Sequence, residues 1–348
     1  MGLWKSSLMK QGRKMILIIL VCIVTLGIAI CIGSVSLHPM DILLVIGHKI
    51  WNLALPETMS ATKVSILWDI RIPREITAFL VGGALAVSGS VMQSILKNPL
   101  ASSYTLGVSS GASLGAALVI GGLIQIPISP FFALPLVGFL FGLATVFVAI
   151  FLSNRFHTGL HNPTVILVGI VLSLFINAIL TVISALKRDS MQQLINWQMG
   201  SFSSRGWSHV MIILPVTIIT TLFIFYFHKE MDILTFGTET AQTMGVNTGR
   251  VKFILLILST ILTGTAVCFT GVIGFVDLIA PHIVRKIFGP SHKYLIPMSI
   301  LLGGAFMTIS DTIARTILSP LELPVGAVTA LIGAPFFAYI FFHKGGKG

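Results

Sequence analysis

Charged residues are scarce in this chain. They make up 9% of its 348 residues, whereas hydrophobic residues make up 55%. Soluble domains carry about 25% charged residues, so the composition excludes a string of soluble domains and predicts a protein that crosses a membrane several times. Cysteine is scarce too: Cys22, Cys31 and Cys268 lie in apolar stretches without paired spacing. They predict neither a disulfide framework nor a metal site.

Sequence signatures of catalysis and nucleotide binding are missing as well. The chain has no G-x-x-x-x-G-K-[ST] loop, because its one Gly-Lys pair, Gly346-Lys347, is followed by glycine. It also has no His-Glu-x-x-His, paired-carboxylate or Ser-His-Asp signature. These absences argue against an enzyme and predict no cofactor. The net charge of +11 comes from basic residues scattered between apolar segments, so it does not indicate a nucleic-acid partner.

The chain contains many long apolar runs instead. A bilayer core needs about 20 mostly apolar residues per helix. The sequence predicts an all-α integral membrane protein with one polytopic domain over residues 1–348 and ten spans, of which the eighth is short, charged and partly sheltered from lipid. The spans are expected near residues 15–36, 76–96, 103–124, 131–152, 164–186, 209–227, 253–272, 274–288, 295–314 and 325–342.

The basic residues of the connections indicate the orientation in the membrane. With both termini in the cytosol, 14 of the 22 Lys and Arg residues fall inside and eight fall outside, among them Arg71, Arg74 and Arg315. Residues 1–32 resemble a signal peptide, but no small-residue cleavage site follows them. We therefore expect an uncleaved first helix.

Two connections are longer than a turn requires. The external stretch 37–69 is polar and irregular, and we expect it at the interface with Trp51 and Trp68 as anchors. The cytosolic stretch 229–252 contains a short expected helix from Thr238, closed by Gly245. This helix is either a docking element or a solvated hairpin, and the residues alone do not decide between them.

Small residues recur at four-residue spacing in the second and third spans. One helix face carries Gly82, Ala86 and Ser90, and another carries Gly107, Gly111 and Gly115. Such faces let helix backbones approach closely within lipid, so we expect tight helix packing here. Between the two spans, Lys97-Asn98-Pro99 ends one helix before the next begins.

Acidic residues are nearly confined to the connections. The exceptions are Asp277 and Asp311, and this scarcity argues against a transporter driven by ions, whose acidic residues lie within the membrane. Asp311 precedes Arg315 by four residues, which predicts an ion pair within one helix. Asp277 pairs with His282 or Arg285, or faces a water-filled passage, and the sequence favours neither alternative.

Seven blocks of sequence occur in a characteristic order between residues 71 and 336. They are Arg71-Ile-Pro-Arg74; Gly83-Ala-Leu-Ala-Val-Ser-Gly89 with Gln93; Asn98-Pro99-Leu-Ala with Leu106-Gly-Val-Ser-Ser-Gly-Ala112; Trp197-Gln-Met-Gly-Ser-Phe202; Ala241-Gln-Thr-Met-Gly-Val246; Gly274-Phe-Val-Asp-Leu-Ile-Ala-Pro-His-Ile-Val-Arg285; and Glu322-Leu-Pro-Val-Gly326 with Gly333-Ala-Pro-Phe336. In these blocks the chain resembles the FecCD-type permeases of ABC importers for iron-siderophores and cobalamin.

The resemblance implies a function and a set of partners. It implies a permease in the bacterial cell membrane that imports iron(III)-siderophore complexes, with haem or cobalamin as the alternative substrate. Its partners would be a second permease subunit, two ATP-binding subunits that hydrolyse the ATP, and an extracellular substrate-binding lipoprotein. An ion-coupled secondary carrier is the alternative from a different class.

The resemblance also implies roles for individual residues. Docking of the binding protein falls to Arg71, Arg74 and Arg315, although interfacial snorkelling also accounts for the first two. Coupling to the ATPase, within the loop 229–252, falls to Glu239, Thr240, Ala241, Met244, Gly245 and Val246. Helix packing and the passage involve Gly83, Gly89, Gln93, Asn98, Pro99, Gly107, Gly111 and Gly115. The chain departs from the family pattern at Lys97, at Ser102-Ser103 and at Asp277, where arginine, an acidic residue with proline, and glycine are usual.

Overall fold

A computed structural model describes residues 2–33, 37–56, 59–156, 160 and 162–345. Helices are the only regular secondary structure within these ranges, which confirms the expected all-α class. Residues 34–36, which end the first expected span, and Lys347 lie outside the described residues.

Each expected span corresponds to a helix. They are α1 (Gly2–Cys31), α4 (Ile72–Ile95), α5 (Val108–Ile120), α6 (Pro130–Phe156), α7 (Asn162–Leu186), α9 (Trp207–Tyr226), α12 (Thr248–Thr270), α13 (Val276–Phe288), α14 (His292–Thr316) and α15 (Val325–Gly345). Seven described segments are long and apolar enough to cross a bilayer unaided. The expected ten is reached only with three shorter ones: α13 has 13 residues, and α5 and α15 carry shorter apolar stretches.

The external stretch 37–69 is more regular than its composition predicts. It forms α2 (Pro39–Trp51) and α3 (Ala61–Ser65), and α3 continues through a π-helical segment, η1 (Ile66–Arg71), into α4. The resulting helix runs over Ala61–Ile95, so the second span begins well before residue 76. The N–H of Ile72 donates to the carbonyl of Leu67, five residues back. Pro73 directly follows this π turn inside the continuous helix, where the hydrogen-bond pattern already changes and a residue without an N–H is accommodated.

The remaining helices are short and lie in the connections. They are η2 (Ser103–Leu106), η3 (Arg188–Ser190), α8 (Met191–Gln198), α10 (His228–Leu234) and α11 (Thr238–Thr243). The short helix that the sequence predicts from Thr238 is therefore present as α11.

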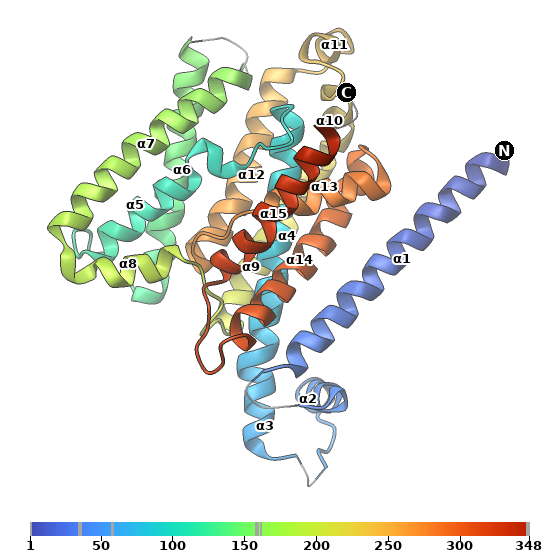
Figure 1. Ribbon diagram of the computed structural model, residues 1–348, viewed down its shortest axis with the longest axis vertical. Coiled ribbons are helices and arrows are strands. Elements are labelled where there is room, and N and C mark those ends of the chain that lie inside the picture. Colours follow the sequence, from blue (N-terminus) through green and yellow to red (C-terminus); the bar gives the residue numbers. More distant parts are fainter. Residues whose placement is uncertain (1, 34–36, 57–58, 157–159, 161, 346–348) are drawn as a thin grey trace.

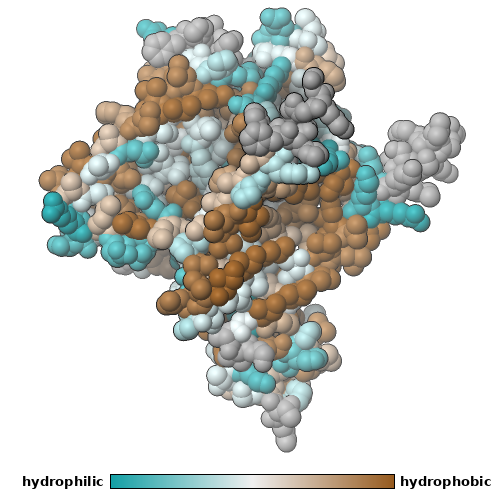
Figure 2. Space-filling model, viewed as in Figure 1, coloured by the Kyte–Doolittle hydropathy of each residue, from teal (hydrophilic) through white to brown (hydrophobic). Residues whose placement is uncertain are grey.

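Helix α4 is the centre of the bundle. It packs against α14, α12, α13 and α9, and Figure 1 shows these helices gathered around it. The most apolar window of the segment containing α4 is 83% buried, against 11% for α7, which lies at the edge with α5 and α6. Apolar residues form broad bands across the middle of the face in Figure 2, as expected for a protein within a bilayer, and hydrophilic residues gather at the top, at the bottom and at the two side margins.

Glycine permits the close contact of α4 with α14. A side chain at Gly82 would overlap the backbone carbonyl of Gly303, and one at Gly303 would overlap Ala86. The small face expected on the second span therefore packs directly against α14, with backbone touching backbone.

Candidate functional site

The outer end of α4 carries a cluster of six charged side chains, called here the outer charge cluster. Its members are Arg71, Arg74, Glu75, Asp311, Arg315 and Glu322. Arg74 Nε and Nη2 donate to the two carboxylate oxygens of Asp311 at 2.8 and 2.9 Å, and its Nη1 donates to Glu322 Oε1 at 2.7 Å. Arg315 Nη2 lies 2.6 Å from Glu75 Oε1. Three arginines thus balance three carboxylates.

Two of these arginines also bind the end of α1. Arg71 Nη1 donates to the carbonyls of Ile30 and Cys31 at 2.9 Å each, and Arg315 Nη2 donates to the carbonyl of Ala29 at 2.5 Å. The last carbonyls of a helix have no partner within that helix and carry partial negative charge, so guanidinium groups are well suited to them. The cluster therefore joins α1, α4, α14 and the loop before α15.

The predicted pair between Asp311 and Arg315 is wrong. Asp311 pairs with Arg74 instead, and Arg315 turns toward Glu75 and α1. The reason is that α4 offers each residue a buried partner of opposite charge: Arg74 for Asp311 and Glu75 for Arg315. An unpaired charge at such a buried position would be costly. The three arginines predicted to dock a binding protein thus all have partners within the chain, and Arg71 and Arg74 are buried.

A second polar contact joins α4 to α13 in the inner half. Gly89 lies against the carbonyl of Asp277, leaving no space for a side chain. Gln93 Nε2 donates to the same carbonyl at 3.1 Å, and Arg285 donates to Gln93 Oε1. Ser102 donates to the Asp277 carboxylate. Among the described residues Asp277 thus accepts a hydrogen bond from Ser102, and Arg285 donates to Gln93 in place of the ion pair with Asp277 that was one of the alternatives above.

The same network reaches the cytosolic connection. His292 Nδ1 lies 2.6 Å from Asp232 Oδ1, and His292 Nε2 lies 2.6 Å from Ser94 Oγ on α4. Burial by itself would raise the pKa of Asp232, but hydrogen bonds from His292 and Ser291 outweigh it and hold that pKa below its ordinary value. Polar side chains thus connect α10 with α14 and α4.

The segment predicted to couple to an ATPase projects from the bundle, as Figure 1 shows for α11. Glu239, Thr240, Met244 and Gly245 are exposed, whereas Ala241 is fully buried. Gly245 has φ +86°, which ends the short helix in a left-handed turn, and Val246 N–H donates to the carbonyl of Ala241 at 3.0 Å. The segment therefore has an exposed face and an anchored one.

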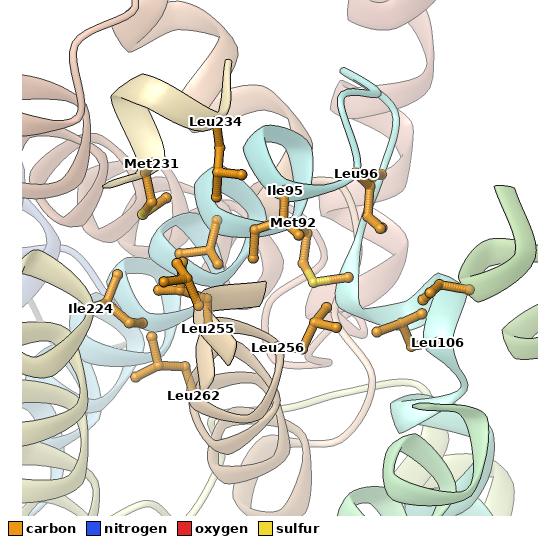
Figure 3. Close-up of a cluster of buried hydrophobic side chains, with 14 of the residues drawn as sticks. Met92, Ile95, Leu96, Leu106, Ile224, Met231, Leu234, Leu255, Leu256 and Leu262 are labelled. Atoms are coloured by element: carbon orange, nitrogen blue, oxygen red, sulfur yellow. The ribbon is translucent and has the colours of Figure 1, made fainter. Parts of the chain in front are cut away.

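Helix α10 fixes this segment to the bundle. Its side chains Met231 and Leu234 enter the largest buried cluster between α4 and α12, beside Met92 and Leu255, as Figure 3 shows. The turn at Asn98 lies at the same end of α4: its Oδ1 accepts the N–H of Leu100 at 2.9 Å across Pro99. Displacement of α11 would thus act on α4 and α12 through packed side chains.

The glycines of the third span pack against α6. A side chain at Gly111 would lie 2.6 Å from the carbonyl of Phe141, and one at Gly115 would lie 2.8 Å from that of Val137. Gly107 has φ +88° and precedes α5, and a side chain there would meet Thr145 of α6, which also lies against Gly111. In α4, Gly83 faces Ile300 of α14.

A metal site is not found in the part of the chain that the structure describes, since no three His, Cys, Asp or Glu side chains converge there. Sequence reasoning did not single out Glu75, Asp232 or His292. Glu75 stands beside Arg74 in the sequence, which was a signal for a charge cluster, but the partners of Asp232 and His292 come from distant helices.

Comparison with known proteins identifies the family of the chain. Residues 17–343 match the model of the FecCD transport family. An uncharacterised ABC transporter permease of Bacillus subtilis is 41% identical over 81% of each chain. The iron(III) dicitrate permease of Escherichia coli is 35% identical over 93% of this chain and 98% of its own. The haemin permease of Yersinia pestis is 33% identical over 96% and 97%.

One solved structure has the same architecture. It is described as an inward-facing conformation of a putative metal-chelate type ABC transporter. The similarity has a TM-score of 0.82 at 27% identity and covers 95% of this chain and 99% of that one.

Proposed function

Because the chain belongs to the FecCD transport family, we propose that it is the permease subunit of an ATP-driven importer for iron(III)-siderophore complexes. Its place as a multi-pass permease of an ABC importer in the cell membrane follows from the family. The choice of an iron chelate is supported by one observation: the dicitrate permease of Escherichia coli matches nearly end to end.

Haem is the alternative substrate, with cobalamin behind it. The haemin permease of Yersinia pestis is almost as similar as the dicitrate permease, so overall identity does not discriminate between the two. An ion-coupled carrier is not favoured, because the similar Bacillus subtilis protein is an ABC transporter permease and the similar solved structure is an ABC transporter.

The proposed mechanism needs partners on both sides of the membrane. Two permeases face each other across a passage, a loaded binding protein docks outside, and two ATPase subunits bind inside. A bulky polar chelate needs such a passage because desolvating it in lipid is costly. ATP-driven closure of the ATPases would push α11, and α10 would pass that displacement to α4 and α12.

Docking at the outer charge cluster would be an exchange of partners. Arg74 is held by Asp311 and Glu322, and Glu322 is the accessible one, with 38% of its side chain exposed. An acidic residue of a binding protein that engages Arg74 would therefore displace Glu322, which lies on the loop leading into α15. We propose that these three arginines, Arg71, Arg74 and Arg315, have two roles. They stabilise the outer end of the bundle, and they bind the docked binding protein.

Uptake by the reconstituted importer tests the proposed function. The permease is isolated from membranes together with its ATPase and placed in vesicles with its binding protein, and uptake of an iron(III)-siderophore, haemin and cobalamin is measured. We expect ATP-dependent uptake of the siderophore complex. Uptake of haemin or cobalamin alone would replace the substrate assignment, and uptake by the permease alone under an ion gradient would overturn the coupling to an ATPase.

A further inference from the structure

An apolar groove lies between the outer halves of α6, α9 and α12, three of the helices labelled in Figure 1. It has a volume of about 570 Å³, and its walls include Phe132, Leu136, Ile212, Val216, Cys268 and Phe269. In the predicted topology, α6 and α9 begin and α12 ends on the outer side. The groove therefore lies at the depth of the outer leaflet.

The outer end of this groove carries polar groups that lack partners. Arg205 precedes α9, and its Nη1 lies 3.4 Å from Nε2 of His209. The Nε of Arg205 and the Nδ1 of His209 are buried and make no hydrogen bond within the described part of the chain, where Arg205 also forms no ion pair. His209 itself is buried, with a relative exposure of 5%.

His209 links Arg205 to the groove. Its ring contacts the rings of Phe131 and Phe269, with centroids 4.8 and 5.8 Å apart, and Phe269 is one of the groove walls. Burial lowers the pKa of Arg205, so its surroundings disfavour the charge. An anion at this position would relieve that cost and would satisfy the buried donors.

The surface around the groove is apolar and exposed. Leu140 of α6 and Ile219 of α9 are about half exposed, and such large exposed apolar side chains are stable where the solvent is hydrocarbon. A soluble acidic partner could pair with Arg205 but would leave the apolar walls empty. A molecule with a negative head and a hydrocarbon chain satisfies both parts.

We propose that this groove binds a phospholipid of the outer leaflet with an anionic headgroup. One acyl chain fills the space between α6, α9 and α12, and the headgroup phosphate accepts hydrogen bonds from Arg205. The site shares no residue with the outer charge cluster or with α11, and it does not depend on the substrate of the importer.

Lipid retention measured by native mass spectrometry tests the proposal. The full permease is exchanged into phosphatidylglycerol or phosphatidylcholine with identical acyl chains. Both lipids carry a phosphate, but the quaternary ammonium of phosphatidylcholine offsets the attraction of its headgroup to Arg205. We therefore expect phosphatidylglycerol, whose headgroup has a net negative charge, to be retained on the order of tenfold better. Arg205→Gln should abolish this preference, Arg205→Lys should keep part of it, and Arg188→Gln, at an exposed arginine on the same side, should leave it unchanged.

The groove is tested by filling it. Val216→Trp should reduce retention of both lipids, whereas Ile219→Trp, on the exposed face of the same helix, should not. Equal retention of the two lipids by the wild type, or an unchanged preference in Arg205→Gln, would overturn the headgroup contact. Unchanged retention by a folded Val216→Trp variant would overturn the acyl-chain site.

Discussion

Arg74 and Asp311, 237 positions apart in the sequence, form a bidentate ion pair with N–O distances of 2.8 and 2.9 Å. Asp311 is fully buried. Removing one member of a buried pair leaves the other charge uncompensated in a medium that solvates it poorly. This pair is therefore expected to control the stability of the contact between α4 and α14.

The Asp311→Asn variant should be strongly destabilised. We expect a loss of about 3 to 5 kcal/mol, because Arg74 would keep only the half-exposed Glu322 as its ionic partner. Thermal unfolding of the purified permease in detergent measures the effect. Asp189→Asn, at an exposed acid on the outer side, is the matched control. Equal stability of the two variants would mean that the pair contributes nothing.

The Gly82→Ala variant should loosen the bundle. The added methyl group overlaps the Gly303 carbonyl, and such overpacking costs about 1 to 3 kcal/mol. Gly27→Ala adds the same group inside α1 where nothing lies within 4 Å, so it should be at least as stable as the wild type. If Gly82→Ala were as stable as Gly27→Ala, the close approach of α4 and α14 would be wrong.

The Asp232 carboxylate should make stability depend on pH. Its pKa in the folded chain lies below the ordinary value of 3.8. The stabilisation is therefore complete above that ordinary value and is lost as the pH falls through the folded-state pKa. The stability difference between the wild type and Asp232→Asn should shrink in that acidic window. The difference should be smaller in a His292→Asn background, which loses the imidazole but keeps the backbone N–H of residue 292 and the Ser291 hydroxyl as donors. An unchanged difference there would assign the effect to those two donors.

The Gly245→Val variant should uncouple ATP hydrolysis from uptake. A side chain at Gly245 meets nothing within 4 Å, so its effect comes from the left-handed backbone, which costs a β-branched residue roughly 1 to 3 kcal/mol. The turn after α11 should then change shape while the bundle remains folded. We expect a several-fold fall in uptake per ATP hydrolysed by the reconstituted importer. Gly249→Ala, inside α12, is the control, and wild-type coupling in Gly245→Val would refute the role of α11.

The Glu322→Gln variant should strengthen docking of an acidic binding protein. Neutralising Glu322 removes the internal competitor for Arg74, and a partly exposed ion pair is worth up to about 1 kcal/mol, or roughly fivefold in affinity. Binding measured at low and high salt should show the gain mainly at low salt. Weaker binding or no change would contradict the proposal that the binding protein displaces Glu322 from Arg74.

Much of the fold could be predicted because apolar length is a local property. Runs such as 164–186 specify a membrane helix by composition alone, and α7 lies there. The expected start of the second span near residue 76 was wrong, since a π turn before Pro73 extends the helix outward to Ala61. No local pattern marks that turn.

The sequence by itself determined the class, the orientation and the position of the short cytosolic helix, because hydropathy, basic residues and glycine breakers act over a few residues. Only the tertiary structure decided which charges meet. Asp311 has an arginine four residues away in its own helix yet pairs with Arg74 of α4. The free energy of burying a charge depends on every group around it, and helix packing brings those groups together from distant parts of the chain.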